Sequence, residues 1–463
     1  MTPPQTKKTV AIVGGGLAGL AAGCALVEAG FAVRLYERRP YLGGRASSYQ
    51  HPGTGEVVDN CQHVLLGCCT NLIDFYRRTG TEGRIHWFEQ LLFLEPGGRQ
   101  SVIQPSFLPA PLHAAPSFLA ASALSLRDKL GIASAMVPLR QEVSDDSRQS
   151  FLDWLRRHGQ TQRAIERFWK VVLVSALNED LERSSAKYAA QVFRESFLKS
   201  REGGRMGIPA VPLSDLYGAA GEYIASRGGE VSLRCPVEGF SVQAKQVVIH
   251  CGGQQATADY LVLAAPFNGL AQLLPEGKES ERLREALSRF ESSPITGVHL
   301  WFDREITDLE HAVLLDRTIQ WMFHKSKLLG RSDPGSYVEL VISSSKQQVE
   351  MGRQEIIDLA LRELAEFFPK AAEARLEKAT VIKEVHATYS PRPGVDEYRT
   401  GPQSEWPRVF LAGDWTATGW PATMEGAVRS GYLAAEALCQ TAGQARRFLV
   451  SGLAATGLSR LLM

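Results

Sequence analysis

The side chains with the clearest capacity for chemistry form a short polar cluster, Asp59, Asn60, Cys61, Gln62 and His63, set between two apolar runs. Burying such groups without partners costs roughly 1 to 3 kcal/mol each, so the cluster must form a hydrogen-bond network or take part in a reaction. His63 is the first candidate for a catalytic acid, because an unperturbed imidazole titrates at about pH 6.5. Asp59 is the second, with a structural role as its alternative, and Cys61 is expected to be a small buried side chain.

Three glycines indicate a phosphate site near the N-terminus. Gly14, Gly16 and Gly19 match G-x-G-x-x-G directly after the strand-like TVAIV and at the start of a helical pattern. Glycine is needed there because the turn is tight, the backbone approaches a pyrophosphate closely, and the helix packs against the strand. Glu37 ends the next predicted strand, where a carboxylate accepts hydrogen bonds from ribose hydroxyls. This combination predicts a bound dinucleotide and leaves its identity open.

Two further strings bear on which dinucleotide is bound. RRPYLGGRASS follows Glu37 and contains Gly44 and Arg45, and VFLAGDWTATGWPATMEGAVRSG contains Asp414. Together they resemble the FAD-dependent amine oxidase and carotenoid desaturase superfamily. The resemblance implies FAD, with Asp414 on the ribityl chain and a helix starting near Ala422 aimed at the flavin pyrimidine. A helix N-terminus suits that position because reduced flavin carries negative charge there.

The cofactor contacts expected from the glycine pattern and from this resemblance are spread along the chain. Val237 matches the small apolar position whose backbone contacts the adenine. The expected set is Gly14, Gly16, Gly19, Glu37, Arg38, Gly44, Arg45, Val237, Gly413, Asp414 and Met424. No spacing of cysteines and histidines resembles a zinc site, so no metal is expected.

Details within the superfamily disfavour amine oxidation. No cysteine lies between 252 and 438, the segment PITGVHLWF contains no lysine, and Thr423 stands where an aromatic cage residue is usual, so the FAD is expected to be non-covalent. The polar cluster, RFWKVVLVSALNED and VPLSDLYGAAGEYIASRGGEV instead resemble the squalene-associated branch, the hydroxysqualene dehydroxylases of hopanoid biosynthesis. The likeness covers nearly the whole chain, and Cys61 departs from the glycine usual at its position.

The resemblance implies that reduced FAD removes the hydroxyl group of hydroxysqualene and gives squalene. Protonation of the oxygen and a dry cavity both favour this reaction. His299, on a predicted strand, is a weaker candidate for the acid. Two alternatives stay open: a carotenoid-type desaturase, which runs the flavin in the opposite direction, and a non-catalytic prenyl-lipid escort protein, which retention of Arg45 and Asp414 disfavours. The chain shows no second G-x-G-x-x-G after a strand, so the electron donor to FAD is unknown.

Composition limits the remaining classes of function and location. The chain has 463 residues and is 44% hydrophobic, enough for two domains. Its 51 basic and 50 acidic residues nearly cancel, which disfavours nucleic-acid binding. Seven cysteines without a disulfide-type framework predict reduced thiols in the cytoplasm. We find no export signal and no apolar run of the roughly 18 to 20 residues that a spanning helix needs.

Two segments are expected to meet an apolar environment. Residues 100–126 contain no formally charged side chain and several prolines, and the tail 441–463 places arginines around an apolar stretch, as interfacial helices do. The expectation is peripheral contact with the inner face of the cytoplasmic membrane, with a docked terminal helix and ordinary packing as the alternative.

The strand and helix patterns predict an α/β fold. TVAIV, LAGLAAGCALVEAG and FAVRLYE form a βαβ unit, and DYLVLAAP and RVFLAGD have the same buried-strand character far along the chain. Residues 150–200 are expected to be helical and PITGVHLWFD a strand. We therefore predict a Rossmann-type FAD-binding domain in three segments, 1–85, 205–275 and 400–440, with an inserted α+β substrate domain, 86–204 and 276–399, and a tail, 441–463.

Overall fold

A parallel sheet joins segments that lie far apart in the sequence. The structure, a computed structural model, describes residues 7–144, 148–331 and 335–463. Its five parallel strands are ordered β10-β2-β1-β14-β20, so the predicted strands from three regions of the chain do meet in one sheet. The edge strand β10 was not anticipated. The bounds are β1 Thr9–Val13, β2 Ala32–Tyr36, β10 Glu230–Ser232, β14 Tyr260–Leu263 and β20 Val409–Leu411.

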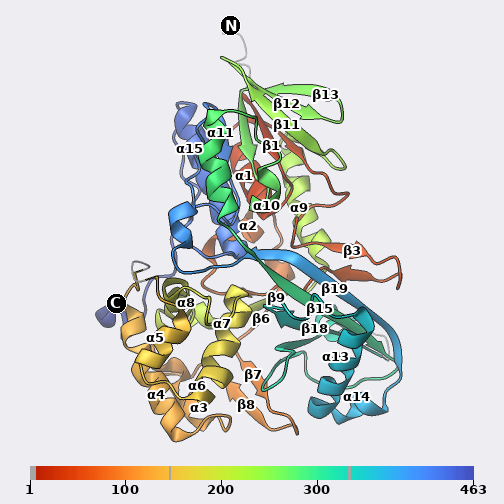
Figure 1. Cartoon of the computed structure of the whole chain (residues 1–463), viewed down its shortest axis with the longest axis vertical. Helices are drawn as coiled ribbons and strands as arrows, with labels where there is room; N and C mark the ends of the chain where they lie inside the picture. The colour runs from red at the N-terminus through yellow and green to blue at the C-terminus, as the bar shows by residue number, and fades with distance from the viewer. Residues whose placement is uncertain (1–6, 145–147, 332–334) are drawn as a thin grey trace.

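Helices cover both faces of this sheet in the upper half of the molecule (Figure 1). Helix α1 is apolar on every side and is buried along almost its whole length, as expected of a helix enclosed by other elements. It packs closely against α15, where a Cβ at Gly431 would lie 2.9 Å from the Cβ of Ala21. The bounds are α1 Leu17–Glu28, α2 Thr70–Arg78, α9 Leu213–Ser226, α10 Phe267–Leu270, α11 Lys278–Ser288 and α15 Met424–Thr441.

A seven-stranded sheet dominates the lower right of Figure 1 and has the order β19-β15-β18-β17-β16-β7-β8. Alternate residues of β15 and β18 face opposite ways: Val298, Leu300 and Leu340 pack in the core that includes helix α13, and their neighbours face away from it. The bounds are β7 Leu91–Leu94, β8 Gln100–Ile103, β15 Ser292–Phe302, β16 His311–Leu314, β17 Trp321–His324, β18 Ser336–Ser343, β19 Leu376–Tyr389, α12 Lys325–Leu328, α13 Arg353–Phe367 and α14 Pro369–Glu373.

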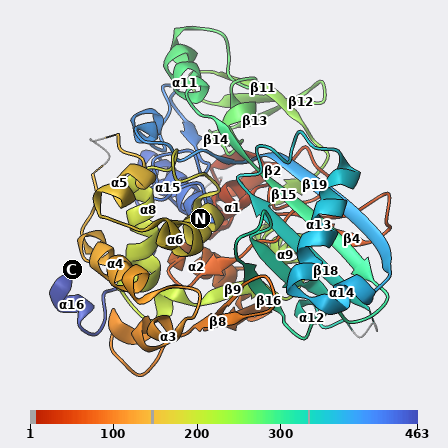
Figure 2. The same cartoon turned by 60° about the horizontal axis from the view of Figure 1, so that its bottom comes forward.

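Three smaller sheets complete the strand content of the described residues. They are β3-β4 (Ser48–Gln50, Val57–Asp59), β5-β9-β6 (Leu65–Leu66, Met206–Pro209, Ile85–Phe88) and β11-β12-β13 (Val237–Val242, Val247–Cys251, Gln254–Ala258). Residues 150–200 are mainly helical, as predicted, and flank one side of the molecule (Figure 2). Their helices, with two neighbours that precede them, are α3 Ala115–Ala120, α4 Leu126–Met136, α5 Phe151–Arg157, α6 Gln162–Ala164, α7 Lys170–Leu177 and α8 Ala186–Phe193.

Two expectations from the sequence are wrong. The tail is not a single helix: after α15 the chain runs without regular structure to a short helix, α16, at Ser459–Leu462. The tail is held by specific contacts instead, since Phe448 is buried and the backbone N–H of Val450 donates to Asn71. The thiols are also not all reduced, because Cys235 and Cys251 form a disulfide where β11 and β12 pair. The division into six segments stays a prediction.

The close approach of α1 and α15 makes Gly431 a sensitive position. Gly431→Ala places a methyl group against the backbone of Ala18 and Ala22 and the Cβ of Ala21, and we expect a loss of about 1 to 3 kcal/mol in the free energy of unfolding from overpacking. Gly218→Ala is the control, because nothing lies within 4 Å of the added group in helix α9. Urea denaturation of both variants checks this, and equal stability would contradict the tight packing.

Candidate active site

The predicted phosphate loop has the geometry that its glycines were expected to provide. Gly14 has φ +111, and a Cβ there would lie 2.7 Å from the carbonyl oxygen of Ala264. Gly16 precedes the first turn of α1, which has no side-chain cap and no acidic residue, so its N–H groups point freely towards an anion. Glu37 is buried and accepts hydrogen bonds from the backbone N–H groups of Gly15 and Arg39, at 2.6 and 2.7 Å.

The segment with Gly44 and Arg45 and the segment with Asp414 meet in space. Arg45 Nη2 lies 2.7 Å from Asp414 Oδ1, and the N–H of Gly43 donates to the carbonyl oxygen of Gly15 at 2.9 Å. Gly44 lies against Gly16, with 3.0 Å between its virtual Cβ and the Cα of Gly16. Regions almost 370 residues apart in sequence thus enclose one loop.

The other expected cofactor contacts surround the same sheet. Gly413 has φ +149 and donates its N–H to Ser430, while Val237 opens strand β11. Met424 is the first residue of α15, and its sulfur accepts a hydrogen bond from Tyr217. Arg38 is exposed to solvent.

Arg399 was not found from the sequence, although it orders this region. Its buried guanidinium donates to the carbonyl oxygen of Asp414 at 3.0 Å and to the carbonyl of Thr416. No motif marked this arginine, which contacts the backbone only once the chain has folded.

The site combines an uncapped helix N-terminus, a glycine loop too closely packed for side chains, and a buried glutamate after the second strand. Together these features define a dinucleotide-binding protein of the FAD type. Residues 17–439 match the model of the family described as flavin containing amine oxidoreductase, and the chain belongs to that family. FAD is therefore its cofactor. When bound, FAD supplies two-electron hydride chemistry.

Relatives and solved structures agree with this assignment. The chain is 28% identical over 454 residues to 15-cis-phytoene desaturase of Synechococcus elongatus, covering 93% of this chain and 95% of that one. It is 27% identical to zeta-carotene desaturase of Synechocystis, covering 94% of this chain and 98% of that one. The crystal structure of an oxidoreductase from Methanosarcina mazei shares the fold, with a TM-score of 0.72, 17% identity and coverage of 91% and 98%.

The polar cluster at 59–63 is a network around a lysine that the sequence did not single out. The Lys325 Nζ donates to Asp59 Oδ2 and to Gln62 Oε1, both at 2.7 Å, and lies 3.7 Å from the carboxylate of Glu339. Asp59 also accepts from Ser48 at 2.5 Å and from the N–H of Leu213 at 3.3 Å. Asp59 and Gln62 belong to the polar loop and Glu339 to strand β18, so the lysine ties the loop to the seven-stranded sheet.

Electrostatics assign Asp59 to the ionised state. Burial alone would raise its pKa, but the charge of Lys325 and the hydrogen bonds from Lys325 and Ser48 lower it below its ordinary value. An ionised carboxylate with both oxygens engaged is a poor proton donor. Asp59 therefore fits the structural role that was its alternative.

His63 also lacks the extra proton that an acid would donate at neutral pH. Its Nδ1 lies 2.7 Å from the carbonyl oxygen of Cys61, so Nδ1 carries the proton. Burial lowers the pKa of His63, which leaves the imidazole neutral with Nε2 as an acceptor. A catalytic role for His63 stays a prediction, and the geometry favours accepting a proton over donating one.

Glu339 and Lys325 are the site residues that sequence reasoning missed. Glu339 lies in the centre of SYVELVIS, a strand whose residues are all buried. An acidic side chain inside such an apolar strand is itself a signal, because buried carboxylates need a partner or a function. His299, the weaker candidate from the sequence, faces the same side of the sheet and hydrogen-bonds through Nδ1 to the Tyr337 hydroxyl at 2.8 Å.

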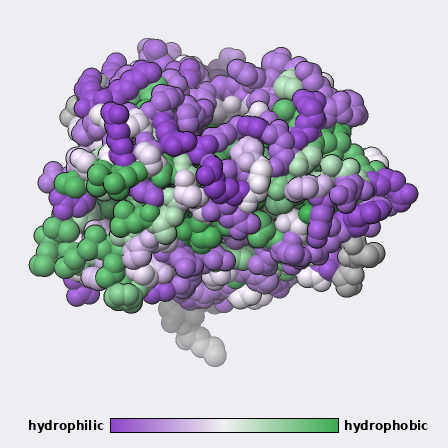
Figure 3. Space-filling model, turned by 90° about the horizontal axis from the view of Figure 1, so that it is seen from below, coloured by the Kyte–Doolittle hydropathy of each residue, from purple (hydrophilic) through white to green (hydrophobic). Residues whose placement is uncertain are grey.

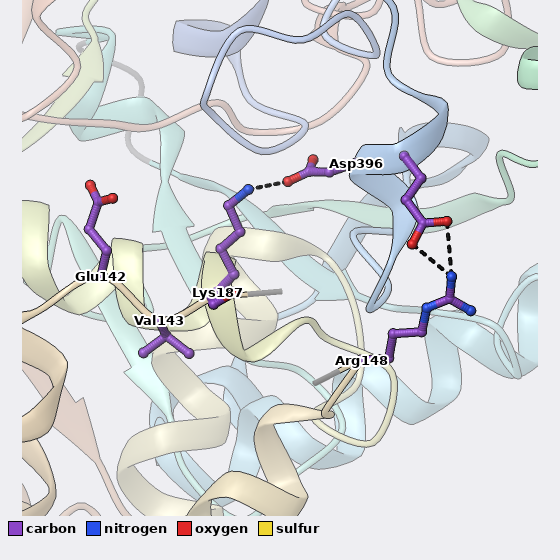
Figure 4. A pocket seen from close by; sticks show the side chains of 7 residues that line it. Glu142, Val143, Arg148, Lys187 and Asp396 are labelled. Carbon is purple, nitrogen blue, oxygen red and sulfur yellow. Dashed lines mark hydrogen bonds and ion pairs between the residues drawn. The ribbon is translucent and has the colours of Figure 1, made fainter. Parts of the chain in front are cut away.

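A separate pocket of about 460 Å³ lies away from this chemistry, between α8 and the 395–398 turn (Figure 4). Its charges pair with one another: Lys187 with Asp396, and Arg148 with Glu397. Glu142 and Val143 complete the wall. Self-paired surface charges offer little to a ligand, and none of the residues expected to bind the cofactor lines this pocket.

The lysine network yields a stability prediction. Lys325→Met should cost about 3 to 5 kcal/mol at neutral pH, because it leaves the Asp59 carboxylate buried without its cation. The loss should shrink as the pH falls and Asp59 takes up a proton. Lys327→Met is the control in the same helix: its ion pair with Glu305 is partly exposed, and such pairs contribute about 1 kcal/mol or less. Denaturation at several pH values measures both, and equal losses would refute the central position of Lys325.

Proposed function

We propose that this protein is a hydroxysqualene dehydroxylase, in which non-covalently bound reduced FAD replaces the hydroxyl group of hydroxysqualene with hydrogen and gives squalene. The observation that carries the proposal is the buried polar group of Asp59, Lys325 and Glu339, which lies beside an apolar wall. Relatives named for phytoene and zeta-carotene, both isoprenoid hydrocarbons, support an isoprenoid substrate.

The apolar wall surrounds the polar side chains on the face of the seven-stranded sheet that is turned away from α13. One cluster there joins the polar loop, the strand β9 and the sheet, and consists of Cys61, Met206, Ile208, Phe323, Leu328 and Val341, with Val64, Leu66 and Trp321 at its edge. Such surroundings exclude water and suit a long hydrocarbon. A hydrocarbon with one oxygen needs only one polar position, and the Lys325 network lies beside this wall.

The chain's own residues have defined tasks in this reaction. The apolar wall holds the chain of the substrate and keeps water from the cation that forms when the C–O bond breaks. A buried acid protonates the oxygen as it leaves, which makes water the leaving group. The ion pair of Lys325 with Asp59 provides a fixed electric field beside the acid.

The reaction is tested by incubating anaerobically reduced protein with hydroxysqualene. We expect squalene as product and stoichiometric return of the oxidised flavin spectrum in a single turnover. Oxidised protein mixed with phytoene is the matched experiment for the carotenoid-type desaturase, which 28% identity to a phytoene desaturase keeps as the second candidate. Flavin reduction by phytoene without hydroxysqualene turnover would reverse the assignment, and no spectral change with either lipid would favour a lipid carrier.

We further propose that one face of the protein lies on the membrane that holds the substrate. Figure 3 shows hydrophobic side chains gathered at one side of the lower face, where α3, α4 and α16 lie in Figure 2. Phe107 is 94% exposed and Leu461 85%. The tail is joined to the 100–126 segment, since the N–H of Ser459 donates to the carbonyl of Ala110 at 3.1 Å. The exposed apolar side chains are Phe107, Leu112, Leu119, Leu126, Leu130, Val137, Leu458, Leu461, Leu462 and Met463.

Within the described ranges, no helix is long and apolar enough to cross a bilayer, so any attachment through this face would be interfacial. Phe107→Ser combined with Leu461→Ser should lower the fraction that floats with liposomes about tenfold or more, because each large apolar side chain contributes roughly 1.5 to 3 kcal/mol when buried. The control pair is Leu233→Ser with Val385→Ser, which are exposed elsewhere. Equal flotation of the two double variants would refute membrane contact through this face.

A further inference from the structure

We propose that a small polar notch beside Gly297 binds the hydroxyl group of the substrate, and that Glu339 in this notch is the acid that protonates the oxygen. The inference rests on the proposed dehydroxylation. It adds the position of the reacting oxygen and the identity of the proton donor, neither of which the motifs marked.

The notch exists because residue 297 has no side chain. A Cβ built on Gly297 would have three nearest neighbours, and all are polar: His299 Nε2 at 3.6 Å, the carbonyl oxygen of Asn60 at 3.8 Å and Glu339 Oε1 at 3.8 Å. The three groups come from β15, from the polar loop and from β18. The three polar groups therefore converge on the space beside the Gly297 Cα, which is where we place the alcohol oxygen.

Two side chains at the notch have polar atoms without a hydrogen bond of good geometry. In the part of the chain that the structure describes, these atoms are both oxygens of Glu339 and the Nε2 of His299, although the Glu339 carboxylate lies 3.7 Å from the Lys325 ammonium and near the N–H of Gln62. Both residues are fully buried at 0% exposure. Buried polar atoms are satisfied in nearly all native structures, so an unpaired set that converges on one space indicates a ligand there.

A hydroxyl group matches the hydrogen-bonding character of the notch. The Asn60 carbonyl can only accept, so it takes the hydrogen of the alcohol. The alcohol oxygen then accepts from a protonated Glu339. His299 Nε2 adds a second donor when the Tyr337 hydroxyl donates to Nδ1, an arrangement that the 2.8 Å contact between them permits.

Charge balance keeps a proton on Glu339. Among the described residues, the ammonium group of Lys325 pairs with both carboxylates: it hydrogen-bonds to Asp59 at 2.7 Å and lies 3.7 Å from Glu339. Burial raises the pKa of Glu339 to about 8 in spite of the lysine. Burial also lowers the pKa of His299 to about 3, so the ring is neutral. The remaining titratable neighbours, Tyr337 and Cys61, both have raised pKa values and carry no charge at neutral pH.

The notch is connected to the cofactor motif through one residue. Asn60 supplies its main-chain oxygen to the notch, and its side-chain amide donates to the carbonyl of Arg45. Arg45 in turn pairs with Asp414, the residue expected on the ribityl chain. An oxygen bound in the notch therefore lies next to the loop that orders the flavin.

Glu339 gives its proton to the alcohol oxygen, the C–O bond breaks with both electrons going to oxygen, and one water molecule leaves. The carbon cation receives a hydride from the reduced flavin, which becomes oxidised. The Glu339 carboxylate formed is then close to the Lys325 ammonium, and it regains a proton from solvent before the next turnover.

The first test fills the notch. In Gly297→Ala the new methyl group meets only ordinary contacts, so the variant should fold and bind FAD. We expect affinity for hydroxysqualene to fall about tenfold or more, and affinity for squalene, which has no hydroxyl, to stay within twofold. Flavin fluorescence of the oxidised holoenzyme measures both ligands without turnover.

The second test removes the acid. Glu339→Gln should lower the single-turnover rate by about 10²- to 10⁴-fold with FAD affinity retained. Glu363→Gln is the matched control: this buried carboxylate in α13 accepts from the N–H groups of Thr318 and Ile319, far from the notch, and its turnover should stay normal.

A pH series gives a readout that does not depend on activity. Because the folded-state pKa of Glu339 is raised above its ordinary 4.5, its contribution to stability is complete below about pH 4.5 and is lost as the pH rises to about 8. Glu339→Gln cannot ionise, so its Tm should rise relative to wild type across this range and level off above it. Glu363→Gln should show no such rise.

Each failure has a distinct signature. If wild-type protein does not convert hydroxysqualene, the proposed function falls and this inference falls with it. If wild type converts it while Gly297→Ala binds both lipids like wild type, or Glu339→Gln turns over normally, the notch alone is refuted. Loss of turnover in His63→Gln with normal rates in Glu339→Gln would make His63 the donor and overturn the assignment.

Discussion

Two buried carboxylates beside the polar loop share one ammonium group. Lys325 lies between Asp59 and Glu339, all three buried, and a net negative charge there would be costly. The lysine therefore fixes Asp59 as the ionised partner and leaves Glu339 as the group that holds a proton. The same contact also joins the flavin-binding half to the seven-stranded sheet, so the charge state and the placement of the two halves depend on one side chain.

One face of the seven-stranded sheet packs in the hydrophobic core, and the other face carries the polar side chains of the candidate site. Residues 298, 300, 338 and 340 pack under α13, while 297, 299, 337 and 339 face the flavin-binding half. Because side chains alternate along a strand, each polar residue on the second face is followed in sequence by an apolar residue on the first face. The sheet can thus carry buried polar groups without weakening its core, and His299 and Glu339 are adjacent because they occupy paired positions of β15 and β18.

The parts predicted from the sequence were those marked by local pattern. The glycine loop, Glu37 and the buried strands near 260 and 410 carry spacing and periodicity that only a few structures satisfy. The Lys325 network could not be predicted, because Lys325 and Asp59 are 266 residues apart and no local motif indicates that they meet. The tail was expected to be helical because arginines flank its apolar stretch, yet contacts of Phe448 and Val450 with the body of the protein decided its path. The Cys235–Cys251 disulfide depends on strand register, which the composition argument ignored.

The order of strands in the parallel sheet also bears on how the protein is made. During synthesis β1 and β2 are available early, but β14 follows more than two hundred residues later and β20 only at Val409–Leu411. A parallel partner that arrives late leaves the edge of β1 without its neighbour while the chain is still growing, and closing such long loops slows folding. Asp414 is positioned only after β20 has joined the sheet. FAD therefore meets all of these binding residues together only after Asp414 has left the ribosome, so capture of the flavin follows the synthesis of all three segments of the parallel sheet.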